Sequence, residues 1–338
     1  MTTPFRLSIA IPLHNEESGV PELLRRLGAV LDSVPGGPHE IVLVDDGSRD
    51  RTLELLHRFA RRDPRLVVVA LSRNFGHQAA LSAALDYVSG DVVIAMDGDL
   101  QDRPEAIPEL LAKHREGFDV VYAQRVKRKE GWPLRLSYFV FYRLLASLAD
   151  VRLPLDSGDF ALMSRQVVDQ IRSAPEHNRY LRGLRSWVGF RQTGLIVERD
   201  DRFAGKTNYS PLKLLELASD GLFSFSIVPL RATAILGLIA IVMSGAFSVY
   251  TLYAKLVLDR TPAGFTSIML FMSFLTGVQL FFLGIIGEYV GRIYQETKRR
   301  PLYVVGSVAR QGAAMPIETH RFVTPQYTPV VPARRTGP

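Results

Sequence analysis

Short apolar runs alternate with helical patterns through the N-terminal part of the chain. The apolar runs are Leu7–Pro12, Glu40–Val44, Leu66–Leu71 and Val92–Met96. Segments with apolar residues three or four positions apart lie between them, at Val20–Val34, Thr52–Arg62 and Gln78–Val88. Short apolar runs predict buried strands, and the longer period predicts helices. Their alternation over residues 5 to about 205 predicts an α/β fold with a mainly parallel sheet that has helices on both faces.

Two long uncharged stretches follow, at Ala232–Ala254 and Thr261–Gly287. As a helix with a rise of about 1.5 Å per residue, the first stretch would be about 34 Å long. The hydrocarbon core of a bilayer is about 30 Å thick. We therefore expect two transmembrane helices within residues 231–291, and a pair of buried core helices is the alternative.

Basic residues flank this pair unevenly. They occur before it and after it, at Lys206, Lys213, Arg231, Arg292, Lys298, Arg299 and Arg300. Near the connecting turn there are only Lys255 and Arg260. The positive-inside rule then predicts a multi-pass protein of the inner (plasma) membrane with both termini in the cytoplasm. The N-terminal segment lacks the pattern of a signal peptide, so we expect the domain that it begins to stay in the cytoplasm.

These patterns divide the chain into four parts. We expect a cytoplasmic α/β domain at residues 1–208, juxtamembrane helices in the membrane interface at 209–230, the two spans at 231–291 and a cytoplasmic tail at 292–338. Another apolar helix, at residues 133–149, suits either the core or the interface. The tail carries repeated prolines and few large apolar residues from about Val305, so we expect it to be disordered.

Composition narrows the possible chemistry. The 338 residues include no cysteine, which excludes disulfides, thiolate metal sites and a cysteine nucleophile. Any metal would be held by oxygen or imidazole ligands, which favours hard ions such as Mg²⁺ or Mn²⁺. The net charge of +7 fits an anionic partner. Because the basic residues gather beside the uncharged stretches and in the tail, we expect that partner to be lipid and not nucleic acid.

Acidic residues follow the predicted strands at the positions where such sheets bind ligands. Asp97 and Asp99 come after the fourth run, and the glycine between them permits a turn that brings both carboxylates to one divalent ion. Such an ion can neutralise a departing diphosphate. A solvated turn is the alternative. The cluster Asp45–Asp50 suits either a nucleoside contact or a helix cap.

Two further polar segments are candidates for acceptor binding. Asp156 and Asp159 form a third acidic cluster, which could orient or deprotonate an acceptor or could be an ordinary loop. The basic loop Arg199–Tyr209 contains glycine and lies directly before the first uncharged stretch. Its arginines suit phosphate oxygens, of a substrate or of anionic lipid. Arg125 is a further phosphate candidate.

In order and spacing, Ile11–Glu17, Val44–Ser48 and Asp97–Asp99 resemble the family 2 glycosyltransferases of GT-A fold. Two more segments, Leu71–Gln78 and Asp99–Asp102, resemble the polyprenyl-phosphate branch of that family. This branch includes enzymes like dolichyl-phosphate mannosyltransferase and the bacterial bactoprenol glucosyltransferases. The resemblance covers about residues 5–303.

The resemblance implies roles for particular residues. The nucleoside of the donor would be held by Pro12, Asn15, Glu17 and Asp46. Mg²⁺ or Mn²⁺ would be held by Asp97 and Asp99, with Gln101 as a further ligand. The catalytic carboxylate on the acceptor side would be Asp159, with Asp156 beside it. The lipid phosphate would be bound by Arg125, Arg202 and Lys206. Arg103 departs from the family pattern, but it lies beyond the metal residues.

The implied reaction is inverting transfer of a hexose from a nucleotide-sugar, UDP-glucose or GDP-mannose, to a polyprenyl phosphate. A phosphate monoester has a second pKa of about 6 and needs little help to lose a proton, so whether Asp159 acts as a base or positions the acceptor stays open. A processive polysaccharide synthase is disfavoured because Arg185-Ser186-Trp187 does not match its Gln-x-x-Arg-Trp motif. An inactive membrane scaffold is the other alternative. Gly287 and Gly291 have the spacing of associating helices, which leaves a homo-oligomer open.

Overall fold

The computed structural model describes residues 5–124, 157–177, 179–197, 228–257, 264–310 and 313–315. The chain divides into two compact units. The first consists of Met1–Arg135, Leu153–Asn208 and Arg300–Pro338, and the second of Leu136–Arg152 and Tyr209–Arg299. The expected boundary after residue 208 lies where the first unit stops, but that unit also includes the C-terminal segment. Residues 209–227 of the expected interfacial helices lie outside the described residues, as does the apolar segment 133–149, whereas residues 228–230 are the first residues of a long helix.

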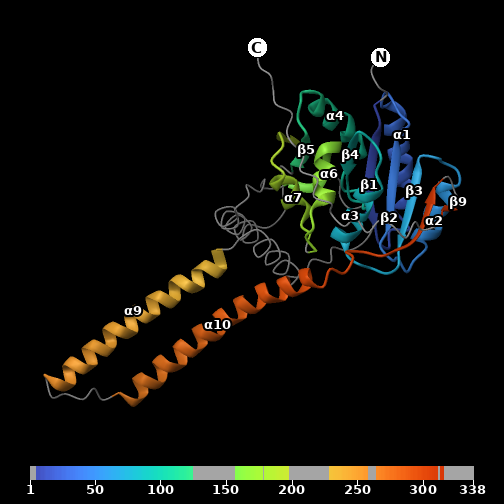
Figure 1. Ribbon diagram of the computed structural model, residues 1–338. Coiled ribbons are helices and arrows are strands. Elements are labelled where there is room, and N and C mark those ends of the chain that lie inside the picture. The colour runs from blue at the N-terminus through green and yellow to red at the C-terminus, as the bar shows by residue number, and fades with distance from the viewer. Residues whose placement is uncertain are drawn as a thin grey trace, which may run out of the picture. The chain divides into compact units, whose positions relative to one another are not determined.

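A single sheet of nine described strands forms the first unit, in the order β7-β5-β6-β4-β1-β2-β3-β8-β9 (Figure 1). The strands are β1 (Leu7–Leu13), β2 (Glu40–Asp45), β3 (Leu66–Leu71), β4 (Val92–Ala95), β5 (Val120–Gln124), β6 (Ser157–Ser164), β7 (Gln192–Ile196), β8 (Val305–Arg310) and β9 (Ala313–Met315). Strands β6 and β8 run opposite to the others. The sheet is therefore mainly parallel, as predicted, and the four strands expected from the sequence are its centre.

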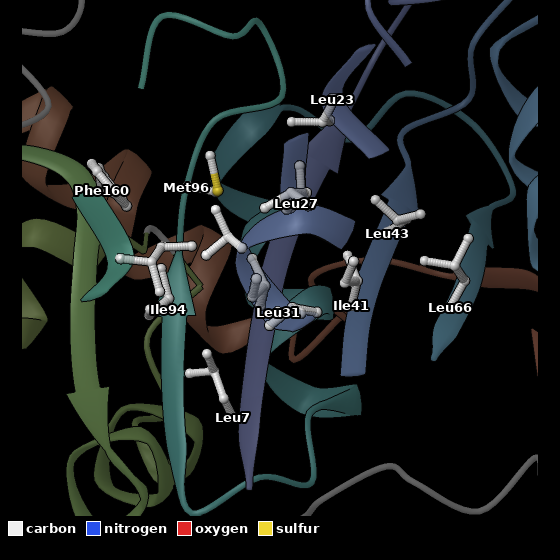
Figure 2. Close-up of a cluster of buried hydrophobic side chains, with 14 of the residues drawn as sticks. Leu7, Leu23, Leu27, Leu31, Ile41, Leu43, Leu66, Ile94, Met96 and Phe160 are labelled. Atoms are coloured by element: carbon white, nitrogen blue, oxygen red, sulfur yellow. The ribbon is translucent and has the colours of Figure 1, made fainter. Parts of the chain in front are cut away.

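Helices cover both faces of this sheet. They are α1 (Val20–Ser33), α2 (Thr52–Ala60), α3 (His77–Tyr87), α4 (Ile107–Arg115), α6 (Arg165–Ser173) and α7 (Leu181–Trp187), with the short 3₁₀ helix η1 (Pro104–Ala106) before α4. One core cluster packs α1, α2 and α4 against one face, and a second packs α3, α6 and α7 against the other. Because successive strand residues point to opposite faces, Ile9 and Ile11 lie in the first cluster and Ala10 in the second. Figure 2 shows Leu27 and Leu31 of α1 lying against the sheet in the first cluster.

Residues 305–310 and 313–315 form strands in a part of the chain where the sequence predicted disorder. Strand β8 pairs antiparallel with β3, and β9 pairs with β8. The Ser72 N–H donates a hydrogen bond to the Val304 carbonyl oxygen at 2.8 Å. Val308 and Ala309 are buried. The expectation of disorder from about residue 305 is therefore wrong for residues 305–310 and 313–315. Strand β3 offers an edge whose backbone groups need partners, and this short segment supplies them.

The second unit contains two long helices, α9 (Val228–Leu256) and α10 (Phe265–Thr297). The first uncharged stretch and residues 265–287 of the second are therefore helical. Their large apolar side chains include many exposed ones, such as Phe247 and Phe281, so the alternative of two buried core helices is not supported. In the described part of the chain one segment, Phe274–Thr297, is long and apolar enough to cross a membrane, and a shorter apolar segment, Ile235–Phe247, lies within α9. Two transmembrane helices are thus not confirmed.

Candidate active site

The loops after β1 and β2 brace each other at the carboxyl end of the sheet. The Asn15 N–H donates to Ser48 Oγ at 2.9 Å, and Asn15 Oδ1 accepts from the Arg49 N–H at 2.8 Å. Asn15 has a φ of 55°, which asparagine tolerates better than most residues. Glu17 Oε2 accepts from the Arg51 N–H at 3.0 Å. The structure thus places the predicted donor residues Asn15 and Glu17 together, at the end of the strand that contains Pro12.

Asp46 anchors the loop that leads from β3 to α3. Its Oδ1 accepts a hydrogen bond from the Phe75 N–H at 2.7 Å, and its Oδ2 accepts from the Gly76 N–H at 2.9 Å. The loop packs directly on Gly47, where a Cβ atom would lie 2.5 Å from backbone atoms of Arg73 and Asn74. The carboxylate of Asp46 therefore shapes the site through the backbone of residues 73–76.

Three titratable side chains from distant parts of the chain meet at the centre of the site. His77 begins α3, Asp97 follows β4, and Asp159 lies in β6. The Nε2 atom of His77 is 3.5 Å from Asp97 Oδ1 and 3.2 Å from Asp159 Oδ2. One ligand atom from each residue lies within 4.8 Å of the others. Asp159, which the sequence placed in an acidic cluster or loop, is therefore a strand residue directed to the same point as Asp97.

Asp97 is held in an environment that disfavours its charge. Burial, and then the nearby charge of Asp159, raise the pKa of Asp97. Its buried Oδ1 atom makes no hydrogen bond to any described residue. A buried carboxylate oxygen that accepts no hydrogen bond, beside a second carboxylate and an imidazole, gives a donor set that a divalent cation can satisfy, so these residues fit a metal ion.

Asp99 and Gln101 continue the loop after β4. Asp99 Oδ1 accepts from the Gln101 N–H at 3.1 Å, and Leu100 between them has a φ of 60°. In the described part of the chain, the three-residue group around Asp97 does not include Asp99. The structure therefore brings together Asp97 and Asp159, which the sequence had assigned to different roles, and leaves Asp99 in the adjoining turn.

Arg182 of α7 binds the carboxylate of Asp159 through two hydrogen bonds. Nε donates to Oδ1 at 2.7 Å, and Nη2 donates to Oδ2 at 3.0 Å. Burial alone would raise the pKa of Asp159, but the charge of Arg182 and the hydrogen bonds from His77 and Arg182 hold that pKa well below its usual range. Asp159 is therefore an ionised carboxylate with both oxygens engaged.

Arg185 lies one helical turn after Arg182 and contacts β6, the strand that contains Asp159. Its Nη1 and Nη2 atoms donate to the Gly158 carbonyl oxygen at 3.3 and 3.4 Å. The guanidinium lies 5.5 Å from the centre of the Tyr122 ring, and burial lowers the pKa of Arg185 to about 10. Together Arg182 and Arg185 hold the side chain of Asp159 and the backbone immediately before it.

Sequence reasoning gave no role to His77, Arg182 or Arg185. A signal for the arginines exists, because Arg179, Arg182 and Arg185 recur every three residues beside a tryptophan. Four predicted site residues, Asp156, Arg125, Arg202 and Lys206, lie outside the described residues, and their roles stay predictions.

Comparison with known proteins identifies the family. Residues 8–172 match the family model described as Glycosyl transferase family 2. The chain is 43% identical over 309 residues to the uncharacterized glycosyltransferase YkcC of Bacillus subtilis, a match that covers 90% of this chain and 94% of that protein. The chain belongs to glycosyltransferase family 2.

Other relatives of this glycosyltransferase have more specific names. The bactoprenol glucosyl transferase of Shigella phage SfV is 38% identical over 301 residues, covering 89% of this chain and 98% of that protein. The prophage bactoprenol glucosyl transferase homolog of Escherichia coli K12 is 35% identical over 306 residues, covering 90% and 100%. The predicted resemblance to the polyprenyl-phosphate branch is thereby confirmed.

One solved structure with a limited likeness is S. aureus TarS in complex with UDP-GlcNAc. It has a TM-score of 0.45 and 19% identity, and the match covers 65% of this chain and 67% of that chain. A likeness of this size supports no conclusion about ligands.

Proposed function

We propose that this glycosyltransferase transfers glucose from UDP-glucose to a polyprenyl phosphate, undecaprenyl phosphate in bacteria, at the cytoplasmic face of the membrane. The observation that carries the proposal is the near end-to-end match to proteins named bactoprenol glucosyl transferases, which reaches 98–100% of their length. The match extends well beyond residues 8–172, so it includes the helices of the second unit as well as the sheet. GDP-mannose as donor to the same lipid is the alternative.

The proposed donor site lies at the ends of β1 and β2. Pro12, Asn15, Glu17 and Asp46 are assigned to the nucleoside. The bracing hydrogen bonds between Asn15 and Glu17 and the β2 loop support this assignment, because they hold the loops in one arrangement before a ligand binds. Asp46 contributes through the loop that it anchors, since both its oxygens already accept backbone hydrogen bonds.

The proposed metal ligands are Asp97 and Asp99, with Gln101 beside them. The lack of a hydrogen bond to Asp97 Oδ1 supports the assignment, and His77 and Asp159 lie close enough to complete or flank the set. A bound Mg²⁺ or Mn²⁺ would act as a Lewis acid that neutralises the negative charge of the nucleoside diphosphate leaving group.

The acceptor phosphate needs to be positioned more than it needs to lose a proton. A phosphate monoester is largely dianionic at pH 7, because its second pKa is about 6. Asp159 is ionised, and Arg182 and His77 already engage its oxygens. We therefore assign Asp159 to orienting the acceptor side of the site, with Asp156 nearby. Arg125, Arg202 and Lys206 are assigned to the lipid phosphate, whose oxygens arginine binds bidentately.

We assign α9 and α10 to two membrane spans, with both termini in the cytoplasm. The apolar segment Phe274–Thr297 supports the second span, and the exposed apolar side chains of α9 support the first. The distribution of lysine and arginine around the helices supports the orientation.

The proposal is tested by sugar transfer with the purified full chain in detergent. Undecaprenyl phosphate is combined with radiolabelled UDP-glucose or GDP-mannose, in the presence of Mn²⁺, of Mg²⁺ or of a chelator. We expect a glucolipid from UDP-glucose that depends on the metal. A mannolipid alone would replace the proposed donor. If folded protein makes no glycolipid from either donor, the transfer proposal is wrong and an inactive scaffold is favoured.

A further inference from the structure

In the proposed function, the anionic acceptor approaches a site that has two carboxylates at its centre. Asp97 Oδ1 and Asp159 Oδ2 both lie within 3.5 Å of the same His77 nitrogen. A dianionic lipid phosphate entering this region meets their combined negative charge, and like charges at short range repel strongly where water is excluded. A bound metal would offset the charge of Asp97, which is its proposed ligand. The charge of Asp159 must then be offset by another group in the fold.

Arg182 is placed to do this. It is the described cation that binds both oxygens of Asp159, and this carboxylate is only 3% exposed. A bidentate arginine both neutralises a carboxylate and fixes the plane in which it lies, which a lysine cannot do in the same way.

A hydrogen bond of the preceding residue, Leu181, holds the start of α7 next to Arg182. The N–H of its neighbour Leu181 donates to Gln78 Oε1 at 3.0 Å. The adjacent residues His77 and Gln78, in the first turn of α3, thus meet Asp159 and Leu181 respectively. The hydrogen bond to Gln78 therefore ties the first turn of α3 to the first turn of α7, and His77 of α3 and Arg182 of α7 meet on the carboxylate of Asp159 in β6.

We propose that Arg182 is a positioning residue for acceptor binding: it holds Asp159 in one orientation and offsets its charge so that the lipid phosphate can bind beside the donor. The inference rests on the proposed transfer to polyprenyl phosphate. It assigns to Arg182 an effect on the acceptor that acts through Asp159, and no direct effect on the donor.

The test measures steady-state kinetics for both substrates in four variants: Arg182→Gln, Arg182→Lys, Asp159→Asn and the double variant Arg182→Gln with Asp159→Asn. For Arg182→Gln we expect kcat/KM for the lipid phosphate to fall about 10- to 100-fold, because two hydrogen bonds to a charged group are lost. The KM for UDP-glucose should stay within about twofold of the wild-type value, since among the described residues the Arg182 side chain forms its hydrogen bonds with Asp159 and none with the loops that carry Asn15, Glu17 and Asp46. Arg182→Lys should recover part of the loss, because it restores the charge without the bidentate geometry.

The double variant decides whether Arg182 acts through Asp159. If it does, the double variant is no worse than Asp159→Asn alone, because residues that act as a unit have non-additive effects. Multiplicative losses, or an equal rise in both KM values for Arg182→Gln, would overturn the proposal. In the double variant the side chains at positions 182 and 159 are both neutral, so no buried charge is left without a partner. Comparing it with Asp159→Asn therefore tests the inference even if Arg182→Gln does not fold.

Two controls separate the possible failures. Arg179→Gln alters an arginine of the same segment, which donates to the Ala174 carbonyl oxygen away from the site, and should leave both KM values unchanged. Wild-type turnover is measured first. An inactive wild type refutes the proposed function and the inference with it, whereas an active wild type with multiplicative variants refutes only the role of Arg182.

Discussion

Replacing Tyr303 by phenylalanine removes one hydroxyl group from the segment that follows α10 and keeps the ring. The ring packs against the second core cluster, on the α3 side of the sheet. The hydroxyl donates to Asp86 Oδ2, at the end of α3, at 2.5 Å. The substitution therefore tests whether the segment that contains Tyr303 is docked on helix α3 of the first unit, without changing the packing of the ring.

The expected loss follows from what remains around Asp86. A hydrogen bond to a charged group contributes about 1.5–3 kcal/mol to stability. Asp86 keeps its contact with Arg172, whose Nε lies 3.2 Å from Oδ1, so the carboxylate is not left unpaired. We therefore expect the lower part of this range, about 1.5–2 kcal/mol. For a unit of this size, such a loss lowers Tm by about 3–8 °C.

Tryptophan fluorescence during thermal unfolding of the purified full chain measures this loss selectively. Trp187 lies in α7 of the first unit, and the long helices contain no tryptophan, so its signal reports the unfolding of the first unit and not of those helices. The matched control is Tyr250→Phe on α9, where the side chain is exposed. Equal Tm values for the two variants would refute the docking of Tyr303 on α3.

Other changes have equally specific expected results. Asp97→Asn should reduce sugar transfer at least about 100-fold, because a proposed metal ligand is lost. The Tm without metal should stay level or rise, because the substitution removes a buried negative charge beside Asp159 whose Oδ1 accepts no hydrogen bond, and a clear fall in Tm would contradict this. Gly47→Ala should destabilise by about 2–4 kcal/mol, since φ is 63° and the new methyl group meets backbone atoms, whereas Gly237→Ala on α9, with nothing within 4 Å, should be harmless in the same melting assay. Ending the chain after Arg299 should expose the edge of β3 and cause aggregation in size-exclusion chromatography, while ending it after Met315 should not. The pKa of Asp159 is lower in the folded protein than in the unfolded chain, so its ionisation stabilises the fold. This stabilisation is fully present above the unfolded carboxyl pKa of about 3.9 and is lost as the pH falls through the lower folded pKa. The difference in Tm between wild type and Asp159→Asn should therefore shrink below about pH 4.

The central sheet was predictable because its signals are local. Strands β1 to β4 are apolar runs whose flanking helices carry their own periodicity, and short crossovers leave few topologies to choose from. Strand β6 was missed because Asp159 interrupts its N-terminal half with a charge. Strand β8 was missed because its sequence, VGSVAR, mixes glycine, serine and arginine with its apolar residues and leads into the proline-rich tail, and its partner β3 lies far away in the sequence.

Within the site, the sequence by itself determined which polar segments follow the predicted strands, and so identified Asn15, Asp46 and Asp97 as candidates. Asp159 was a candidate from its acidic cluster and from the family resemblance, and its place in strand β6 came from the structure. Only the tertiary structure decided which of them meet. The hydrogen bond between His77 and Asp159 spans 82 residues, and that between Tyr303 and Asp86 spans 217. Periodicity reports which face of an element is buried, but not which distant side chain faces it. Those pairings form when the strands and helices assemble and buried charges need partners, as with Asp159 and Arg182.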